Sequence, residues 1–238
     1  MTLNNKFIFD VDGTLTPSRG KIDPDFEKWF ADFCINNDVY LVTGSDYPKT
    51  VEQLGERLLR WPVTVYNCSG NDVWQKGVNI RTSEWQLPDL ARYFLESCMY
   101  ESKFPLRTGN HIEERPGMVN FSVVGRNATP GERKLYINHD QKYSERNTIA
   151  AAFNTMFPDI EARPGGETGI DIAPRGLNKS QILNDFDQDN DFVLFFGDRM
   201  DTGGNDFPLA DALINGWQGA NYHVKDWQHT WQLLKELV

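Results

Sequence analysis

The chain has 238 residues, of which 39% are hydrophobic and 13% aromatic, and it carries a net charge of −10 at pH 7. This composition supplies enough apolar side chains for a packed core and argues against a disordered chain. The excess of acidic residues disfavours binding to nucleic acid, so an anionic ligand would need a local cluster of basic side chains.

The apolar runs and the cysteines exclude further classes of protein. No run approaches the roughly 20 residues that span a bilayer, and the first residues lack the apolar stretch of a signal peptide, so we expect no membrane contact. The three cysteines form no C-x-x-C pair, which disfavours a disulfide framework and a structural zinc site. These features lead us to expect a reducing, cytoplasmic location.

The first third of the chain alternates between predicted strands and helices. A short apolar run at 6–10 predicts a strand buried on both faces, and Asp23 is suited to cap the helix that follows it. Further strands are predicted at 39–42 and 63–66, on either side of a helix over 48–60. This alternation is typical of a doubly wound parallel sheet, so the predicted fold class is α/β.

The middle of the chain loses this alternation and predicts helices mixed with antiparallel strands. The predicted elements, in order, are a helix over 88–102, strands at 111–115 and 118–124, a long helix over 140–156, and strands near Ile160 and at 169–172. Antiparallel strands with helices segregated from them indicate a small α+β module inserted into the first domain.

After this module the α/β pattern resumes. A helix is predicted over 178–186, and the run at 192–196 predicts the most apolar strand of the chain. A last strand near Ala212 and a C-terminal helix over 225–236 complete the pattern.

The change of pattern divides the chain into two predicted domains. Residues 1–80 and 174–238 are predicted to form the α/β core, and residues 81–173 an inserted α+β cap that closes over the site.

Polar clusters follow three of the predicted strands. Asp10 and Asp12 come after the first strand, Thr43 after the second, and Asp198 after the strand at 192–196. Because ligands bind beyond the carboxyl ends of the strands in open α/β sheets, we expect these clusters to form one site. Carboxylates a few ångströms apart need a counter-charge, which an oxygen-ligated Mg²⁺ ion and a lysine would supply.

This set of residues fits phosphoryl transfer. A strand-end carboxylate such as Asp10 beside Mg²⁺ can attack phosphorus and form an aspartyl phosphate. A second carboxylate, Asp12, can protonate the leaving group and later deprotonate the incoming nucleophile. Thr43 and Lys179 are suited to hold the phosphoryl oxygens by hydrogen bond and charge.

Two other kinds of site fit the residues less well. Asp-x-Asp-Gly could open a calcium loop, but that loop needs glycine at position six and glutamate at position twelve, whereas Gly13 is at position four and Lys21 at position twelve. Lys179-Ser180 lacks the preceding glycine-rich stretch of a nucleotide P-loop, which disfavours a kinase.

The same residues resemble a known superfamily. The segment 9–16, Phe-Asp-Val-Asp-Gly-Thr-Leu-Thr, resembles the first motif of the haloacid dehalogenase superfamily of phosphotransferases. Thr43, Lys179 and Gly197-Asp198 with Gly204-Asn205-Asp206 are similar to its second, third and fourth motifs. The resemblance implies a core with the fold of that superfamily and an inserted cap.

Within that superfamily, the sequence is most similar to the eukaryotic-type phosphomannomutases. The match to the opening segment of the family extends to Arg19, which occupies the position of the family's substrate-contacting arginine. Arg115, Arg126 and Arg133 match the three phosphate-binding arginines of the family's cap at the same spacing. Asp171 matches the aspartate that touches the sugar hydroxyls.

Two positions depart from the family's pattern. Gly169 stands where the family carries a serine two residues before that aspartate, which removes one hydrogen bond to the substrate. Ala212 stands where the family has an aspartate in the segment that holds an accessory cation, with Asp211 displaced by one position.

The resemblance implies an Mg²⁺-dependent phosphotransferase that interconverts mannose 1-phosphate and mannose 6-phosphate. It makes Asp10 the nucleophile and Asp12 the general acid and base. Mg²⁺ would be bound by Asp10, the backbone carbonyl of Asp12, and Asp198. The implied partners are a small phosphorylated sugar and, since family members pair through their caps, a second copy of the chain.

Two alternatives stay open from the sequence alone. A phosphatase on the same scaffold would transfer the phosphoryl group to water instead of a sugar hydroxyl. A catalytically silent sugar-phosphate-binding protein is the third hypothesis, but the joint presence of Asp10, Asp12, Lys179 and Asp198 argues against it.

Overall fold

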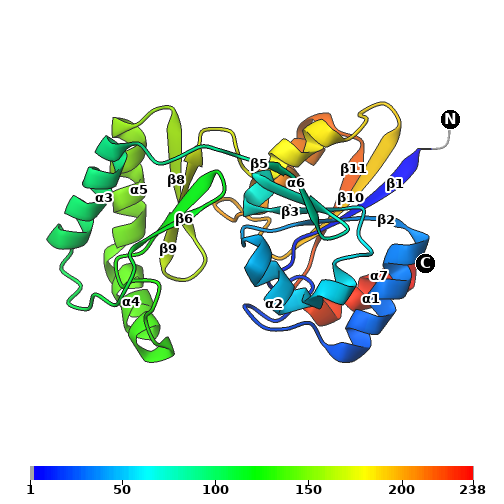
Figure 1. The fold of residues 1–238 in the computed structure, drawn as a ribbon, viewed down its shortest axis with the longest axis horizontal. Helices are drawn as coiled ribbons and strands as arrows, with labels where there is room; N and C mark the ends of the chain where they lie inside the picture. Colours follow the sequence, from blue (N-terminus) through cyan, green and yellow to red (C-terminus); the bar gives the residue numbers. More distant parts are fainter. Residues whose placement is uncertain (1–2, 238) are drawn as a thin grey trace. The chain divides into compact units, whose positions relative to one another are not determined.

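The computed structural model describes residues 3–237, which divide into two compact units (Figure 1). Unit 1 comprises the residues up to Thr82 and those from Leu177 onward, and unit 2 is Ser83–Gly176. Each unit has hydrophobic clusters formed only by its own residues. Unit 2 is therefore an insertion with a core of its own.

Unit 1 is built on a seven-stranded, mostly parallel sheet. In order across the sheet, the strands are β11 (Gly219–His223), β10 (Asp191–Gly197), β1 (Asn4–Phe9), β2 (Asp38–Val42), β3 (Thr64–Asn67), β4 (Asp72–Gln75) and β5 (Val78–Thr82). The first five run parallel to one another, whereas β4 pairs antiparallel with β3 and β5 antiparallel with β4. This confirms the predicted α/β fold class.

Helices cover both faces of this sheet, which is why its central strands are continuously apolar. They are α1 (Pro24–Asn36), α2 (Tyr47–Leu58), α6 (Phe207–Gly216) and α7 (Trp227–Leu237), with the 3₁₀ helices η1 (Cys68–Gly70) and η2 (Lys179–Asp185). Residues of α1, α2 and α7 form one hydrophobic cluster, and residues of α6 and η2 join another. The predicted cap of α1 is confirmed, because Asp23 accepts hydrogen bonds from two backbone N–H groups of its first turn.

The predicted strand near Ala212 was wrong. Ala212 lies in α6, and the last strand is β11. Pro208 in the first turn favours a helix, and Leu209 and Leu213, four positions apart, share the buried face. The segment predicted as a helix over 178–186 forms η2, a tighter 3₁₀ helix.

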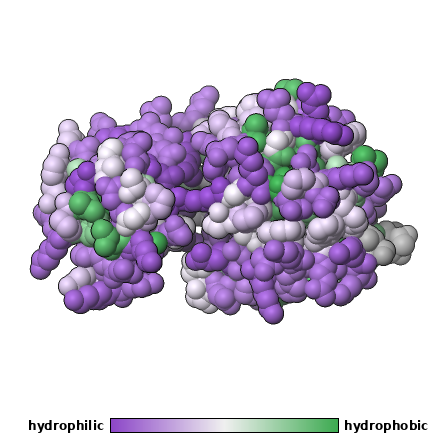
Figure 2. Space-filling view, turned by 90° about the horizontal axis from the view of Figure 1, so that it is seen from below, coloured by the Kyte–Doolittle hydropathy of each residue, from purple (hydrophilic) through white to green (hydrophobic). Residues whose placement is uncertain are grey.

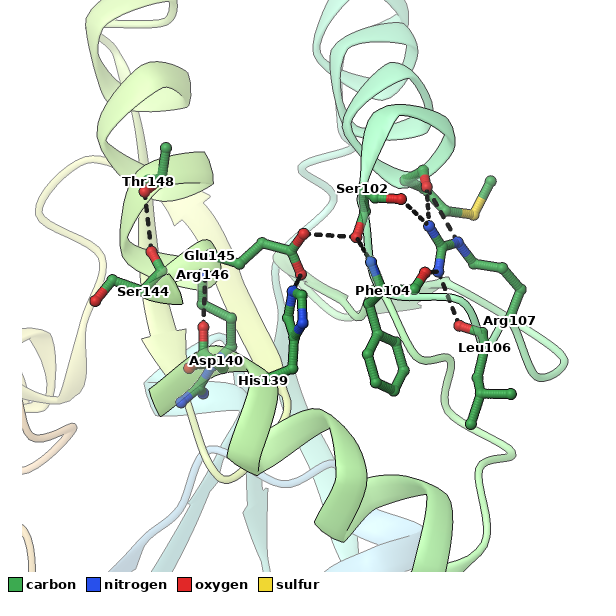
Figure 3. Close-up of polar contacts among 11 residues, drawn as sticks. Ser102, Phe104, Leu106, Arg107, His139, Asp140, Ser144, Glu145, Arg146 and Thr148 are labelled. Carbon is green, nitrogen blue, oxygen red and sulfur yellow. Dashed lines mark hydrogen bonds and ion pairs between the residues drawn. The ribbon is translucent and has the colours of Figure 1, made fainter. Parts of the chain in front are cut away.

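Unit 2 has a separate antiparallel sheet covered by three helices (Figure 1). The order of its strands is β6 (Ile112–Arg115), β7 (Met118–Phe121), β9 (Gly169–Pro174) and β8 (Ile160–Gly165). The helices are α3 (Asp89–Glu101), α4 (Pro130–Tyr143) and α5 (Glu145–Met156). Glu145 links them, since it accepts a 2.5 Å hydrogen bond from Ser102 at the end of α3 and lies 3.6 Å from His139 of α4 (Figure 3).

The predicted single helix over 140–156 was also wrong, because two helices meet at Ser144. Ser144 has a left-handed backbone with φ of 51°, which ends α4. Asp140 then accepts from the backbone N–H of Arg146 at 2.8 Å and so caps the start of α5 (Figure 3). Apolar periodicity does not reveal α4, because two of its three buried side chains, Arg133 and Asp140, are charged.

The face drawn in Figure 2 is mostly hydrophilic, and its hydrophobic residues form small separate patches. Within residues 3–237, no helix has the length and apolar character needed to cross a membrane.

Candidate active site

The order of the strands brings the predicted polar clusters to one edge of the sheet. Because β10, β1 and β2 are neighbours and run parallel, Asp198, Asp10 and Thr43 each follow the same end of adjacent strands. The hydrogen bond from the Asp10 N–H to the Phe196 carbonyl continues the ladder past the end of β1. The sheet therefore fixes the backbone of Asp10.

Lys179 is the buried cation of the site. Its Nζ donates to Asp10 Oδ1 at 2.5 Å and to Asp206 Oδ1 at 2.7 Å. None of these three side chains is more than 2% exposed. An ammonium group without water needs such partners, so the two carboxylates hold Lys179 in place.

Three carboxylates gather at this point. Oxygens of Asp10, Asp198 and Asp206 all lie within 4.8 Å of one another. Gly13 makes room for them: its φ is +93°, and a Cβ there would lie 2.5 Å from Asp198 Oδ2. A side chain at position 13 would therefore both strain the backbone and displace an acid of the site.

The electrostatics show a shortage of positive charge. Burial raises the pKa of Asp10 well above its ordinary value; Lys179 opposes this rise, and Asp206 and Asp198 add to it. Burial and the carboxylate of Asp206 likewise raise the pKa of Asp198 to about 6. Burial lowers the pKa of Lys179, but the carboxylates of Asp10 and Asp206 outweigh it and raise the pKa above its ordinary range. One lysine does not balance three acids.

The cluster fits a hard divalent cation. All its donors are carboxylate oxygens, the ligands that Mg²⁺ prefers. Asp10 Oδ2 is buried and has no hydrogen-bond partner in the described part of the chain, which suits an oxygen that faces a cation or a ligand. The sequence did not single out Asp206 as part of the site, although it belongs to the fourth motif. After Gly204-Asn205 it is typical of a turn, so only the fold reveals its contact with Lys179.

Asp12 lies outside the three-acid cluster. Its Oδ1 accepts a hydrogen bond from the backbone N–H of Arg19 and another, of 3.1 Å, from Gln53 Nε2. Thr43 is buried, and its hydroxyl oxygen accepts from the backbone N–H of Ser45 at 3.1 Å, which leaves the hydroxyl hydrogen for an acceptor in the site.

The predicted cap arginines lie in unit 2, and each forms an ion pair with a carboxylate. Arg115 and Arg126 share Glu113; the Arg115 pair measures 3.2 Å. Arg133 pairs with Glu167 at 3.0 Å. Burial tends to raise the pKa of Glu113, but the two guanidinium groups outweigh it and lower the pKa below its ordinary value.

Asp171 lies on β9 opposite Asn120 of β7, and Asn120 Nδ2 donates to its carboxylate at 2.6 Å. The same contact explains the glycine at 169, because a Cβ there would lie 2.6 Å from that Nδ2 atom.

Arg146 supports the turn between β8 and β9 by donating to the carbonyls of Gly166 and Gly169, each at 3.2 Å. Asp140 in turn holds Arg146 through a 2.7 Å ion pair (Figure 3).

Comparisons with known proteins indicate the family of the chain. The family model for eukaryotic phosphomannomutase matches residues 27–238. Phosphomannomutase 1 of Mus musculus is 35% identical over 243 residues, which cover 97% of this chain and 90% of that protein. The phosphomannomutase of Saccharomyces cerevisiae is 31% identical over 212 residues, 85% of this chain and 83% of that protein.

Solved structures show the same fold at much lower identity. The C-terminal domain of C. albicans trehalose-6-phosphate phosphatase superposes with a TM-score of 0.65 at 17% identity and covers 99% of this chain and 92% of that one. N-terminally truncated IMP-nucleotidase of Plasmodium falciparum gives 0.66 at 16% identity, over 100% of this chain and 70% of that one. These likenesses establish a haloacid dehalogenase-like fold.

Proposed function

Because the chain belongs to the eukaryotic phosphomannomutase family and is an enzyme, we propose that it interconverts mannose 1-phosphate and mannose 6-phosphate. The observation that carries the proposal is the buried contact between Lys179 and Asp10 at the end of β1. Lys179 orients the Asp10 carboxylate through Oδ1 and leaves Oδ2 without a hydrogen-bond partner among residues 3–237. A carboxylate held in this way is suited to attack phosphorus.

The proposed reaction passes through phosphorylated Asp10. A free hydroxyl of the mannose phosphate attacks that phosphorus, Asp12 takes the hydroxyl proton, and the bond from phosphorus to Asp10 breaks. The resulting bisphosphate turns end for end. Asp10 then attacks the other phosphoryl group, and Asp12 returns the proton to the departing sugar oxygen. Thr43 and Lys179 hold the phosphoryl oxygens by hydrogen bond and charge.

Mg²⁺ belongs to the proposal. Asp10, the backbone carbonyl of Asp12, and Asp198 would hold it. A carboxylate oxygen of Asp206 lies within 4.8 Å of oxygens of Asp10 and Asp198. When bound, the cation would offset the negative charge of the carboxylates and the phosphoryl oxygens.

The phosphate that is not transferred needs its own binding site. We assign it to Arg115, Arg126 and Arg133 and assign contacts with the rest of the sugar phosphate to Arg19 and Asp171. A bound phosphate would take the place of Glu113 and Glu167 beside the three arginines. This set of cationic side chains in a chain of net charge −10 favours a mutase, because a mutase must bind a bisphosphate.

A sugar-phosphate phosphatase is the second candidate, because phosphatases share this fold. It would form the same phosphorylated Asp10 and pass the phosphoryl group to water. The experiment that separates the two is ³¹P NMR of the enzyme with mannose 1-phosphate, Mg²⁺ and a catalytic amount of hexose 1,6-bisphosphate. We expect the mannose 6-phosphate signal to grow with little inorganic phosphate. If inorganic phosphate is the sole product from every hexose phosphate, the enzyme is a phosphatase.

The proposal includes a homodimer joined through unit 2. The basis for it is that members of the family pair through their caps. Light scattering on the purified protein should give twice the mass of one chain. The mass of a single chain at micromolar concentration would contradict it.

A further inference from the structure

Gln53 is a buried glutamine whose amide contacts Asp12. It lies on α2 and is 2% exposed. Its Nε2 donates to Asp12 Oδ1 at 3.1 Å and to Thr16 Oγ1 at 3.2 Å. Its backbone carbonyl accepts from the N–H of Ile22 at 2.9 Å, which holds this part of α2 against the loop that follows β1.

The neighbouring hydroxyl fixes which end of the amide faces Asp12. Thr16 Oγ1 donates its single hydrogen to the carbonyl of Val11 at 3.3 Å. Its oxygen can then only accept from Gln53, so Nε2 and not Oε1 must lie beside Thr16. The same Nε2 lies beside Asp12, and the amide therefore donates to the carboxylate.

The side chain of Gln53 does not favour the stability of the folded protein. Its Oε1 is buried and has no hydrogen-bond partner within residues 3–237. A buried acceptor without a partner costs stability, and an apolar side chain of the same length would avoid that cost. A residue that breaks the rules of packing beside a proposed catalytic group indicates a function.

Two donors bind the same oxygen of Asp12. Gln53 Nε2 and the backbone N–H of Arg19 each donate to Oδ1. On the basis of the proposed function, we infer that Gln53 is a positioning residue for the general acid. It holds Oδ1 so that Oδ2 exchanges the proton with the reacting oxygen of the substrate. As the bond from phosphorus to that oxygen breaks, the oxygen keeps the electron pair and receives the proton from Oδ2.

A test needs substrates that differ only in their need for this proton. Dinitrophenolate leaves without protonation, whereas phenolate is a poor leaving group that benefits from it. We expect Gln53→Met to lower the rate of phenol release in the first turnover of phenyl phosphate by about tenfold to a hundredfold. The first turnover is measured because the later transfer from phosphorylated Asp10 to water uses Asp12 as a base with both substrates. The first-turnover rate for 2,4-dinitrophenyl phosphate should change by less than about twofold, and the melting temperature of the variant should equal or exceed that of the wild type.

Thr50→Val is the matched control. Thr50 lies one turn earlier on α2, is fully buried, and donates to Asn67 Oδ1 at 2.7 Å without contacting Asp12. Its loss should lower the melting temperature but leave the ratio of the two first-turnover rates unchanged. Gln53→Asn keeps an amide that is too short to reach, so it should repeat the kinetic loss and provides the test if Gln53→Met does not fold.

The outcomes separate this inference from the proposed function. Equal losses on both aryl phosphates, or no loss on phenyl phosphate, would overturn the role of Gln53. The expected split without interconversion of mannose phosphates would keep that role and reject the mutase. If the wild type forms no phosphorylated Asp10 from either aryl phosphate, both are wrong.

Discussion

Lys179 and Asp10 form a 2.5 Å ion pair although 169 positions separate them in the chain. Their contact joins η2 to the end of β1 inside unit 1. Removal of Lys179 would leave two buried carboxylates, those of Asp10 and Asp206, without the cation that they share, which is among the most destabilising changes a protein can undergo. Without the charge of Asp10, Lys179 would keep Asp206 as its partner.

Lys179→Met should therefore destabilise the protein as well as inactivate it. We expect a loss of about 3–5 kcal/mol in the free energy of unfolding, measured by urea denaturation without Mg²⁺. Lys49→Met is the control, because Lys49 forms an exposed pair with Glu52 and should change stability by less than about 1 kcal/mol. Similar effects of the two substitutions would mean that the buried pair is not a structural element.

Asp10→Asn tests the proposed nucleophile. The substitution keeps the size of the side chain and removes its charge, so turnover should fall by about 10³-fold or more while the fold persists. Circular dichroism checks the fold, and beryllofluoride should bind to Asp10 in the wild type. Asp211→Asn, at an exposed aspartate on α6 that bonds to Asn215, should stay fully active. Activity of Asp10→Asn within tenfold of the wild type would reject the assignment.

The raised pKa of Asp198 predicts how Mg²⁺ affects stability at different pH. Folding raises this pKa from 3.8 to about 6, so the carboxyl favours the folded state while it is protonated. That stability is present below the unfolded value and is lost as the pH rises through about 6. Mg²⁺ then offsets the charge, so it should raise the melting temperature more at about pH 7.5 than at about pH 5. Asp198→Asn should reduce the difference, and an equal shift at both pH values would contradict the metal site.

Arg126→Ala should affect only substrates whose phosphate binds at the arginines of unit 2. The lost charge-assisted contact is worth about 1.5–3 kcal/mol, which lowers affinity for mannose 1-phosphate about tenfold to a hundredfold. Hydrolysis of a small aryl phosphate should hardly change. Arg163→Ala, at an exposed arginine of β8 that pairs with Glu161, should behave like the wild type with both. Equal losses on both substrates would make Arg126 a structural residue.

Gly169→Ser should destabilise unit 2 instead of restoring a sugar contact. The new Cβ would displace Asn120 and break its hydrogen bond to Asp171, at a cost of about 1–3 kcal/mol. Gly131→Ala is the control, because nothing lies near a Cβ there and alanine favours the helix α4. A serine variant as stable as the wild type, with higher affinity for the sugar phosphate, would show that Asn120 can move aside.

Much of unit 1 could be predicted because parallel strands buried on both faces are continuous apolar runs. Once β1, β2 and β10 were expected in one sheet, the proximity of Asp10 and Asp198 followed from their places after the strands. Apolar patterns do not reveal the helices and contacts that depend on buried polar side chains. For this reason α4, which buries Arg133, was missed, as was the contact of Asp206 with Lys179.

Carboxylates that pair with the cap arginines were equally hidden from the sequence. Glu113 lies two positions from Arg115 but thirteen from Arg126, and Glu167 pairs with Arg133 across 34 positions. Charged residues of both signs occur along the whole chain, so only the fold selects the pairs. Gln53 belongs to the same class, since a glutamine on a helix is usually exposed.

The placement of β10 between β11 and β1 determines what can fold while the chain is being synthesised. Unit 2 has all the residues of its core once Gly176 has left the ribosome. Strand β1 by then can pair with β2, but its other edge, with Phe7, Ile8 and Phe9, waits for Asp191–Gly197. An unpaired apolar edge is a site of aggregation, so the nascent chain presents its greatest need for a chaperone after the insertion has folded and before the last fifth of the chain is complete.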